Sequence, residues 1–152
     1  MKKSVKRFIV SALSVMSVSS SILGLNANAT NGGNPFYSFT INPSVGTYTR
    51  LNDVESKYTY SYVYLYVTSA TRDFYIQTLG IDSYGLTHNC TWYTTVHCSK
   101  NKRYMITNSI KESGYNAADL QFCLVSSYNY DTLSGDWSPD SSPVAGETYT
   151  YV

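Results

Sequence analysis

The chain has 152 residues, of which 14% are charged and 15% are aromatic, and 16 of its residues are Tyr. That length allows one ordinary domain, and so many aromatic residues beside so few charges exclude a disordered tail or a coiled coil. The formal net charge of +1 provides no large electric field, so we expect no nucleic-acid partner.

The first 29 residues have the three-part pattern of a secretory signal peptide. A basic start precedes an apolar stretch over residues 8–25, and Ala27-Asn28-Ala29 offers small residues at the two positions that a signal peptidase reads. We therefore expect cleavage after Ala29 and a secreted, extracellular protein. No second apolar segment of spanning length follows, so the mature chain is predicted to have no membrane span.

Cleavage would change the charge of the protein. It would remove four of the eleven basic residues and none of the ten acidic ones, which leaves a mature chain with a net charge of −3. Residues 30–35 are interpreted as a flexible lead-in because Gly, Asn and Pro dominate them. Residues 36–152 are interpreted as a single β-rich domain.

The first part of this domain predicts strands. Residues 36–41 form a short strand that Asn42-Pro43 ends. The strongest signal covers residues 57–68, where alternate positions are occupied by five tyrosines: Tyr58, Tyr60, Tyr62, Tyr64 and Tyr66. A period of two with Tyr, Val and Thr predicts one long strand. Residues 73–81 predict the next strand, joined to it by a hairpin at residues 69–72 and followed by a turn at 81–85.

The second part continues the pattern. Strands are predicted over residues 91–98, 103–107, 120–125 and 148–152. The segment 107–118 predicts either a loop or a short helix that begins at Asn108 and ends at Gly114. Ser134-Gly135 and the prolines at 139 and 143 are interpreted as turns that close the domain. Six or seven short strands predict a small antiparallel β-sandwich or barrel.

The five tyrosines are the main candidate binding residues. Tyr has an apolar ring with a polar tip, so an exposed row could stack on the sugars of a cell-envelope polymer. The alternative is a half-buried sheet face in which each Tyr packs against cross-strand neighbours.

Three cysteines lie in the mature part, at positions 90, 98 and 123. Outside the cell a disulfide is the usual state of cysteine, and an odd number leaves one thiol over. Cys90 could pair with Cys98 if the chain turns between them, or Cys98 could pair with Cys123. The sequence leaves this choice open.

Motifs for catalysis or metal binding are absent from the sequence. His88, Cys90, His97 and Cys98 lack the paired spacing of zinc ligands, and neighbours on a strand such as His97 and Cys98 point to opposite faces. No Gly-x-Ser-x-Gly, His-Glu-x-x-His or phosphate-binding glycine loop occurs. We therefore predict no catalytic residue, no metal and no cofactor.

Two segments carry a resemblance. The first is Tyr37-Ser38-Phe39-Thr40-Ile41 with Asn42-Pro43 and Tyr48-Thr49-Arg50, and the second is Ser134-Gly135-Asp136-Trp137 preceded by Tyr128-Asn129-Tyr130. They are similar to the opening and closing segments of an uncharacterised family of small exported proteins of Gram-positive bacteria, a domain of unknown function. The resemblance implies export and a small β-rich fold and carries over no catalytic residue. The tyrosine strand and the three cysteines depart from the family pattern.

These observations leave two functions. The first is a secreted, non-enzymatic domain that binds an envelope component, another protein or a partner cell, by analogy of class with bacteriocins. The alternative is a secreted hydrolase in which two carboxylates, or a Cys and a His, converge in the fold.

Overall fold

The computed structural model describes residues 30–31, 34–125 and 131–152, and the chain divides into two units, residues 1–30 and 31–152. The predicted signal peptide and the segment 128–130 lie outside the described residues. The described residues contain no helix. Their strands are β1 (Thr30–Asn31), β2 (Asn34–Pro35), β3 (Tyr37–Ile41), β4 (Thr49–Arg50), β5 (Glu55–Ser56), β6 (Tyr62–Ser69), β7 (Phe74–Ile81), β8 (Thr87–Asn89), β9 (Val96–Cys98), β10 (Arg103–Ile106), β11 (Ala117–Leu124), β12 (Leu133–Ser141) and β13 (Thr150–Tyr151).

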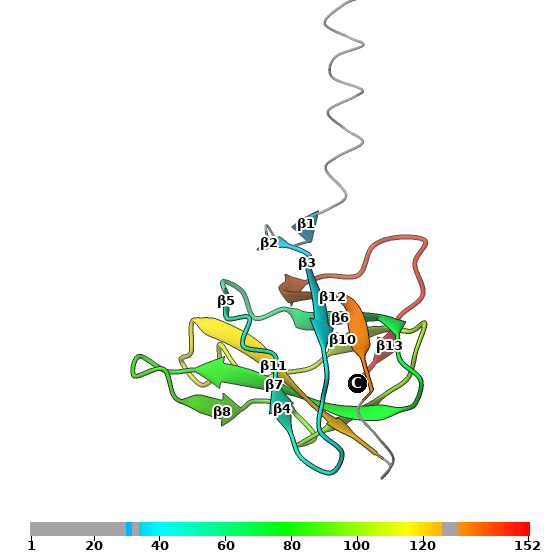
Figure 1. Cartoon of the computed structure of the whole chain (residues 1–152). Coiled ribbons are helices and arrows are strands. Elements are labelled where there is room, and N and C mark those ends of the chain that lie inside the picture. The colour runs from blue at the N-terminus through cyan, green and yellow to red at the C-terminus, as the bar shows by residue number, and fades with distance from the viewer. Residues whose placement is uncertain (1–29, 32–33, 126–130) are drawn as a thin grey trace, which may run out of the picture. The chain divides into compact units, whose positions relative to one another are not determined.

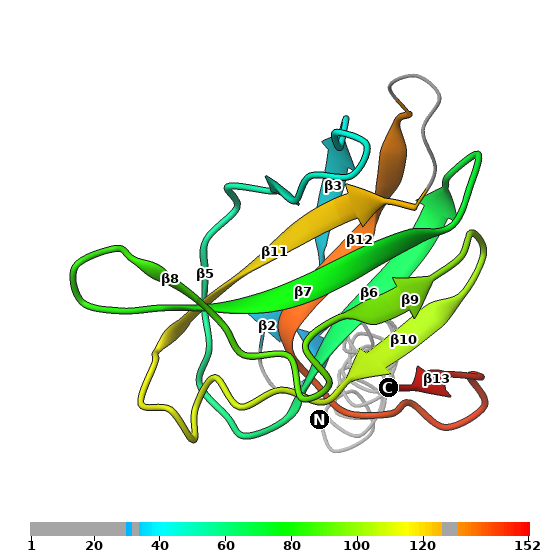
Figure 2. The same ribbon diagram turned by 90° about the horizontal axis from the view of Figure 1, so that it is seen from below.

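Strands β3 to β13 form two sheets, which Figures 1 and 2 show from two directions. One sheet has the strand order β13-β10-β6-β12-β3, and all its pairs are antiparallel except the parallel pair of β13 with β10. The other has the order β4-β11-β7-β8, with β5 also on β11 and β9 also on β7. The predicted all-β sandwich or barrel is therefore confirmed.

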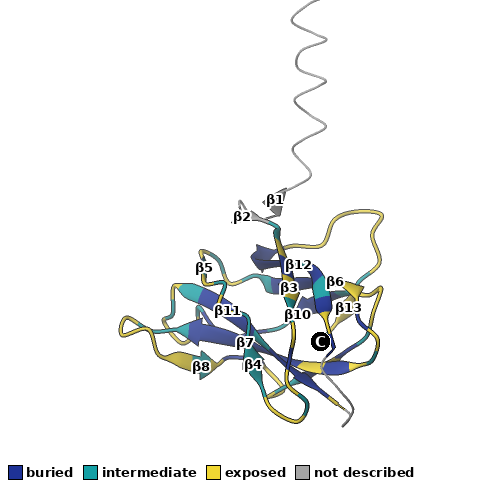
Figure 3. Ribbon diagram, viewed as in Figure 1, coloured by how far each residue is buried: buried dark blue, intermediate teal, exposed yellow. Residues whose placement is uncertain are grey.

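The core lies between the two sheets because alternate residues of each strand point inward. Val63, Leu65 and Val67 of β6 are fully buried. The ring of Phe122 on β11 lies 5.3 Å from that of Phe39 on β3, so it joins one sheet to the other. Figure 3 shows buried residues along the central strands and exposed residues in the loops. Leu120, Phe122 and Leu124 alternate along β11, and all three are buried in this core.

The predicted hairpin at residues 69–72 is wrong. β6 pairs with β10 and β12, whereas β7 pairs with β11, β8 and β9, so the chain crosses between sheets there. Asp131 accepts hydrogen bonds from the amide and hydroxyl of Thr71 and faces Arg72, and these contacts hold the crossing. Local alternation finds strands, but it carries no information about their partners.

The predicted strand over residues 91–98 is also wrong in its first half. Only β9 is extended, and the segment before it turns, with Thr94 in the left-handed region at a φ of 71°. The strand β8 was not predicted. β8 pairs with the end of β7 and β9 pairs with its beginning. Residues 90–95 therefore form the loop that joins these two short strands along the same side of β7.

The turns predicted at Ser134-Gly135 and Pro139 are wrong, because these residues lie in strand β12 in the middle of its sheet, whereas Pro143 follows that strand. Proline lacks the amide hydrogen that a residue of a central strand donates, so the sequence around Pro139 does not predict a strand. The register of β12 against β6 shifts between Ser138 and Ser141, and this irregularity accommodates Pro139. Trp137 is fully buried, and its Nε1 donates to Asp53.

Of two further local predictions, one is wrong and one is confirmed. The short helix proposed for residues 107–118 does not form, because the described chain makes turns there and enters β11 at Ala117. The predicted turn after β7 is confirmed, since the Asp82 carbonyl accepts from the Gly85 amide. No helix among the described residues has the length and hydropathy to cross a membrane.

Candidate functional site

The five tyrosines do not lie on one strand. β6 begins at Tyr62, and Tyr58 and Tyr60 stand in the irregular segment before it, 67% and 72% exposed. The predicted strand over residues 57–68 is therefore too long at its start. Tyr62, Tyr64 and Tyr66 do share the face of β6 that points away from the core, because they alternate with the buried aliphatic residues.

The outward face of β6 is covered by other rings. The ring centroid of Tyr64 lies 4.8 Å from that of Phe36 and 6.4 Å from that of Tyr149, and Tyr64 is only 6% exposed. The ring of Tyr62 meets that of Tyr151 edge to face at 5.8 Å. Burial raises the pKa of Tyr64 to about 12. This face is packed as part of the fold, so most of the row is not an open platform.

The segment that carries Tyr58 and Tyr60 is held by a buried ion pair. The Nζ atom of Lys57 lies 3.0 Å from Asp140 Oδ1, and both side chains are fully buried. Nζ also donates to the Pro139 carbonyl at 2.7 Å and to the Ser61 carbonyl at 2.9 Å. The ammonium group has three hydrogens, so these three acceptors satisfy it completely.

The carboxylate of Asp140 also binds backbone amides of the same segment. One carboxylate oxygen accepts from the Tyr58 amide at 2.6 Å, and the other accepts from the Thr59 amide at 3.1 Å. The hydroxyls of Thr59 and Ser61 donate to it as well. Burial alone would raise the pKa of Asp140, but these hydrogen bonds and the charge of Lys57 outweigh it and lower that pKa. We call residues 57–61 the clamped segment.

Next to the clamped segment lies a hollow of about 260 Å³, here called the aromatic hollow. Its lining residues are Tyr60, Ser61, Tyr62, Trp92, Thr107, Asn108 and Glu112. Trp92 is 63% exposed, so both it and Tyr60 present ring surface to solvent. Among the described residues, no hydrogen bond or ion pair involves the side chains of Tyr60, Trp92 and Glu112.

Trp92 reaches the hollow because its loop is fixed at several points. The Trp92 amide donates to the Thr107 carbonyl at 3.2 Å, and Thr91 forms a bridge with Asn108. The Asn89 side chain donates to the Thr94 carbonyl at 2.8 Å, which closes the loop at its other end. The left-handed conformation of Thr94 completes this turn.

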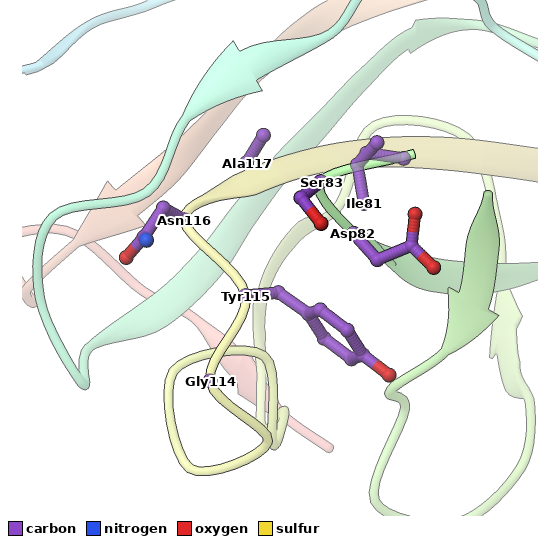
Figure 4. Close-up of a pocket in the computed structure, with 7 residues that line it drawn as sticks. All are labelled: Ile81, Asp82, Ser83, Gly114, Tyr115, Asn116 and Ala117. Carbon is purple, nitrogen blue, oxygen red and sulfur yellow. The ribbon is translucent and has the colours of Figure 1, made fainter. Parts of the chain in front are cut away.

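A second hollow of about 400 Å³ lies where β7 ends and β11 begins. Figure 4 shows the side chains of Asp82, Ser83 and Tyr115 at its wall. Asp82 Oδ2 lies 3.0 Å from Nε2 of His88, and this hydrogen bond is the largest cause of the lowered pKa of Asp82. His88 also stacks on the ring of Tyr115 at 4.9 Å, so its ring is occupied on two sides.

His97 and its neighbour Cys98 are not placed to act as a pair. His97 is exposed beside Asp73 at 3.5 Å, whereas its neighbour Cys98 is fully buried, so the predicted opposition of their side chains is confirmed. Within the part of the chain that the structure describes, no group of three His, Cys, Asp or Glu side chains is placed to hold a metal ion.

All three cysteines are buried free thiols. Cys98 lies opposite Phe74 and Cys123 lies opposite Tyr75, and since neighbouring residues of β7 point to opposite faces, these two sulfurs are on different sides of the sheet. The Cys90 amide donates to Thr78, four residues along β7 from Phe74. That separation is about 13 Å, which exceeds the reach of a disulfide. In this structure the three thiols are free, and their positions favour neither predicted pairing.

We expect alkylation to confirm three free thiols. Treated with iodoacetamide in denaturant without reductant, the protein should gain three carbamidomethyl groups by mass spectrometry. The folded protein should react far more slowly, because burial raises the pKa of all three thiols and the thiolate is the reactive form. Gain of a single group in denaturant would reveal a disulfide and contradict the fold.

One family model matches residues 25–141, and its description is protein of unknown function, DUF2712. No curated protein and no solved structure matches the chain. The match covers both segments that carried the resemblance in the sequence. It also includes Lys57 and Asp140, which sequence reasoning missed. An isolated Lys near an aromatic run gives no local sign that its partner is an aspartate on β12.

Proposed function

The chain belongs to the family described as protein of unknown function DUF2712, and from that premise we propose that it is a secreted, non-enzymatic domain that binds a component of the bacterial cell envelope. The binding site in this proposal is the aromatic hollow. The observation that carries it is the presence of exposed rings on a segment that a buried ion pair holds rigid.

Exposed aromatic rings that gather around one hollow are characteristic of interaction sites. Tyr58, Tyr60 and Trp92 are each more than 60% exposed. The clamped segment is irregular in structure, yet its amides and hydroxyls are bonded to Asp140. Because the segment is already ordered, little conformational entropy would be lost when a ligand binds.

Retention of the purified protein on envelope material tests the proposal. We expect the protein to be retained on insoluble peptidoglycan, on immobilised teichoic acid or on intact Gram-positive cells. Tyr60→Ala and Trp92→Ala should each weaken retention by about tenfold, because truncation of a central aromatic residue commonly costs 1–2 kcal/mol or more. The measurement is the bound fraction against the amount of envelope material.

Two controls make the outcome specific. Tyr84→Ala removes a ring that is 88% exposed and does not line the aromatic hollow, so retention should be unchanged. Tyr64→Ala removes a buried ring and should reduce stability instead. The proposal is overturned if the unmodified protein is not retained on any of the three materials, or if Tyr60→Ala and Trp92→Ala bind as well as it does.

A further inference from the structure

The aromatic hollow combines rings with one carboxylate. Tyr60, Tyr62 and Trp92 supply three π-faces, and Glu112 is the charged residue among the lining side chains. The polar groups of Asn108 are already used, since its amide donates to the carbonyls of Ser61 and Ile106 and its oxygen accepts from the Ile110 amide. The groups left for a ligand therefore include the ring faces, the Tyr60 hydroxyl, the Trp92 indole N–H and the carboxylate of Glu112.

That combination favours a compact organic cation. The face of an aromatic ring is negative and attracts a cation, Trp most strongly, and the attraction grows when water is displaced. A carboxylate beside the rings adds charge complementarity. A neutral sugar would also stack on these rings, but it would not balance the charge of Glu112, so the carboxylate favours a cation over a neutral ligand.

We propose that the aromatic hollow binds a substituted ammonium group carried by an envelope component, with the cation against Tyr60 and Trp92 and balanced by Glu112. This deepens the proposed function and rests on it. Two sources supply this chemistry, a quaternary ammonium headgroup such as choline and a primary ammonium group, that of a lysine side chain or of an alanine whose α-amino group is free. The experiment separates them.

Trp92 provides a specific signal for the test. The chain has two tryptophans, and Trp137 is fully buried, so a ligand in the aromatic hollow changes the emission of Trp92 alone. The probes are choline, Nα-acetyl-lysine amide, which keeps its side-chain ammonium group, and 3,3-dimethylbutanol, which is the neutral carbon analogue of choline. We expect saturable quenching by at least one of the two ammonium probes and a much weaker response to the neutral analogue. The tighter of the two ammonium probes identifies the source.

Variants connect the signal to the site. Glu112→Gln and Tyr60→Ala keep the Trp92 reporter, and each should weaken binding of the ammonium probe by about fivefold, which corresponds to about 1 kcal/mol. Trp92→Phe should abolish the fluorescence response. Glu147→Gln, a charge change at a residue that pairs with Arg103 outside the hollow, should leave binding of the probe unchanged.

Equal binding of the neutral analogue, or no saturable response to either ammonium probe, would overturn the inference. If the envelope retention of the protein still depends on Tyr60 and Trp92 in that case, the proposed function stands and only the ligand chemistry falls. If the ammonium probes bind but the envelope materials do not retain the protein, the envelope role falls and the ligand chemistry of the hollow stands.

Discussion

Replacing Lys57 by alanine should lower the free energy of unfolding by about 3–5 kcal/mol, because it leaves the buried carboxylate of Asp140 without its counter-charge. It also leaves the carbonyls of Ser61 and Pro139 without a donor. Urea unfolding followed by fluorescence gives the measurement. Lys111→Ala is the matched control, since Lys111 bonds an exposed Asn116, and its loss should change stability by less than about 0.5 kcal/mol.

A double replacement distinguishes this pair from a simple ion pair. Apolar residues of similar size often replace a buried ion pair without loss of stability. Lys57→Met with Asp140→Leu should not recover stability here, because the amides of Tyr58 and Thr59 would then be buried without an acceptor. Recovery to within about 1 kcal/mol of the unmodified protein would show that the pair does not organise the clamped segment.

The pH dependence of the same unfolding checks the role of Asp140. Its pKa is lowered in the folded protein, so its contribution to stability is fully present above the unfolded pKa of about 3.9 and is lost as pH falls through the folded value. Asp140→Asn should reduce that acid-dependent loss. An unchanged loss of stability below about pH 4 in this variant would assign the acid sensitivity to other carboxylates.

The second large effect is expected at Gly135. A Cβ atom added there would overlap the backbone carbonyl oxygen of Tyr66 and lie 3.1 Å from ring carbons of Phe39. Gly135→Ala should therefore destabilise the protein by about 3 kcal/mol or more, since neither the β6 backbone nor a buried ring can move freely. The Phe39 ring covers the position that a side chain would occupy.

Gly146→Ala is the matched control for Gly135→Ala. Gly146 has a φ of 89° and open space around it, so alanine there pays only the conformational penalty of about 1–2 kcal/mol. A cost at Gly135 no greater than at Gly146 would contradict the close packing of β12 against β6. Thermal or urea unfolding of the two variants side by side gives the comparison.

These contacts explain the Ser-Gly-Asp-Trp segment that carried the family resemblance. Gly135 permits the close approach of two strands, and Trp137 fills the core and donates to Asp53. The side chains of Ser134 and Asp136, at the alternate positions, bond Thr40 and Ser38 of the edge strand β3. The residues of this motif therefore pack β12 against β6 and bond it to β3.

The candidate site was only partly predictable. The tyrosine pattern directed attention to residues 58–66, and Tyr60 and Tyr62 do line the aromatic hollow. Trp92 was missed because the sequence assigned it to a strand that does not form there, and Glu112 was missed because it stands in a loop, where periodicity carries no signal. Asp140 is 83 residues from Lys57 in the chain, and no local pattern connects the two.

The sequence by itself determined which side chains of a strand face the core, because alternation follows from the two-residue period of an extended backbone. It therefore indicated an all-β fold. Strand pairing, the separation of the three thiols and the residue at which the tyrosine-bearing strand begins were decided only by the tertiary structure. Each depends on contacts between distant residues, above all the buried carboxylate of Asp140, whose hydrogen bonds draw residues 57–61 out of the strand that their alternation predicts.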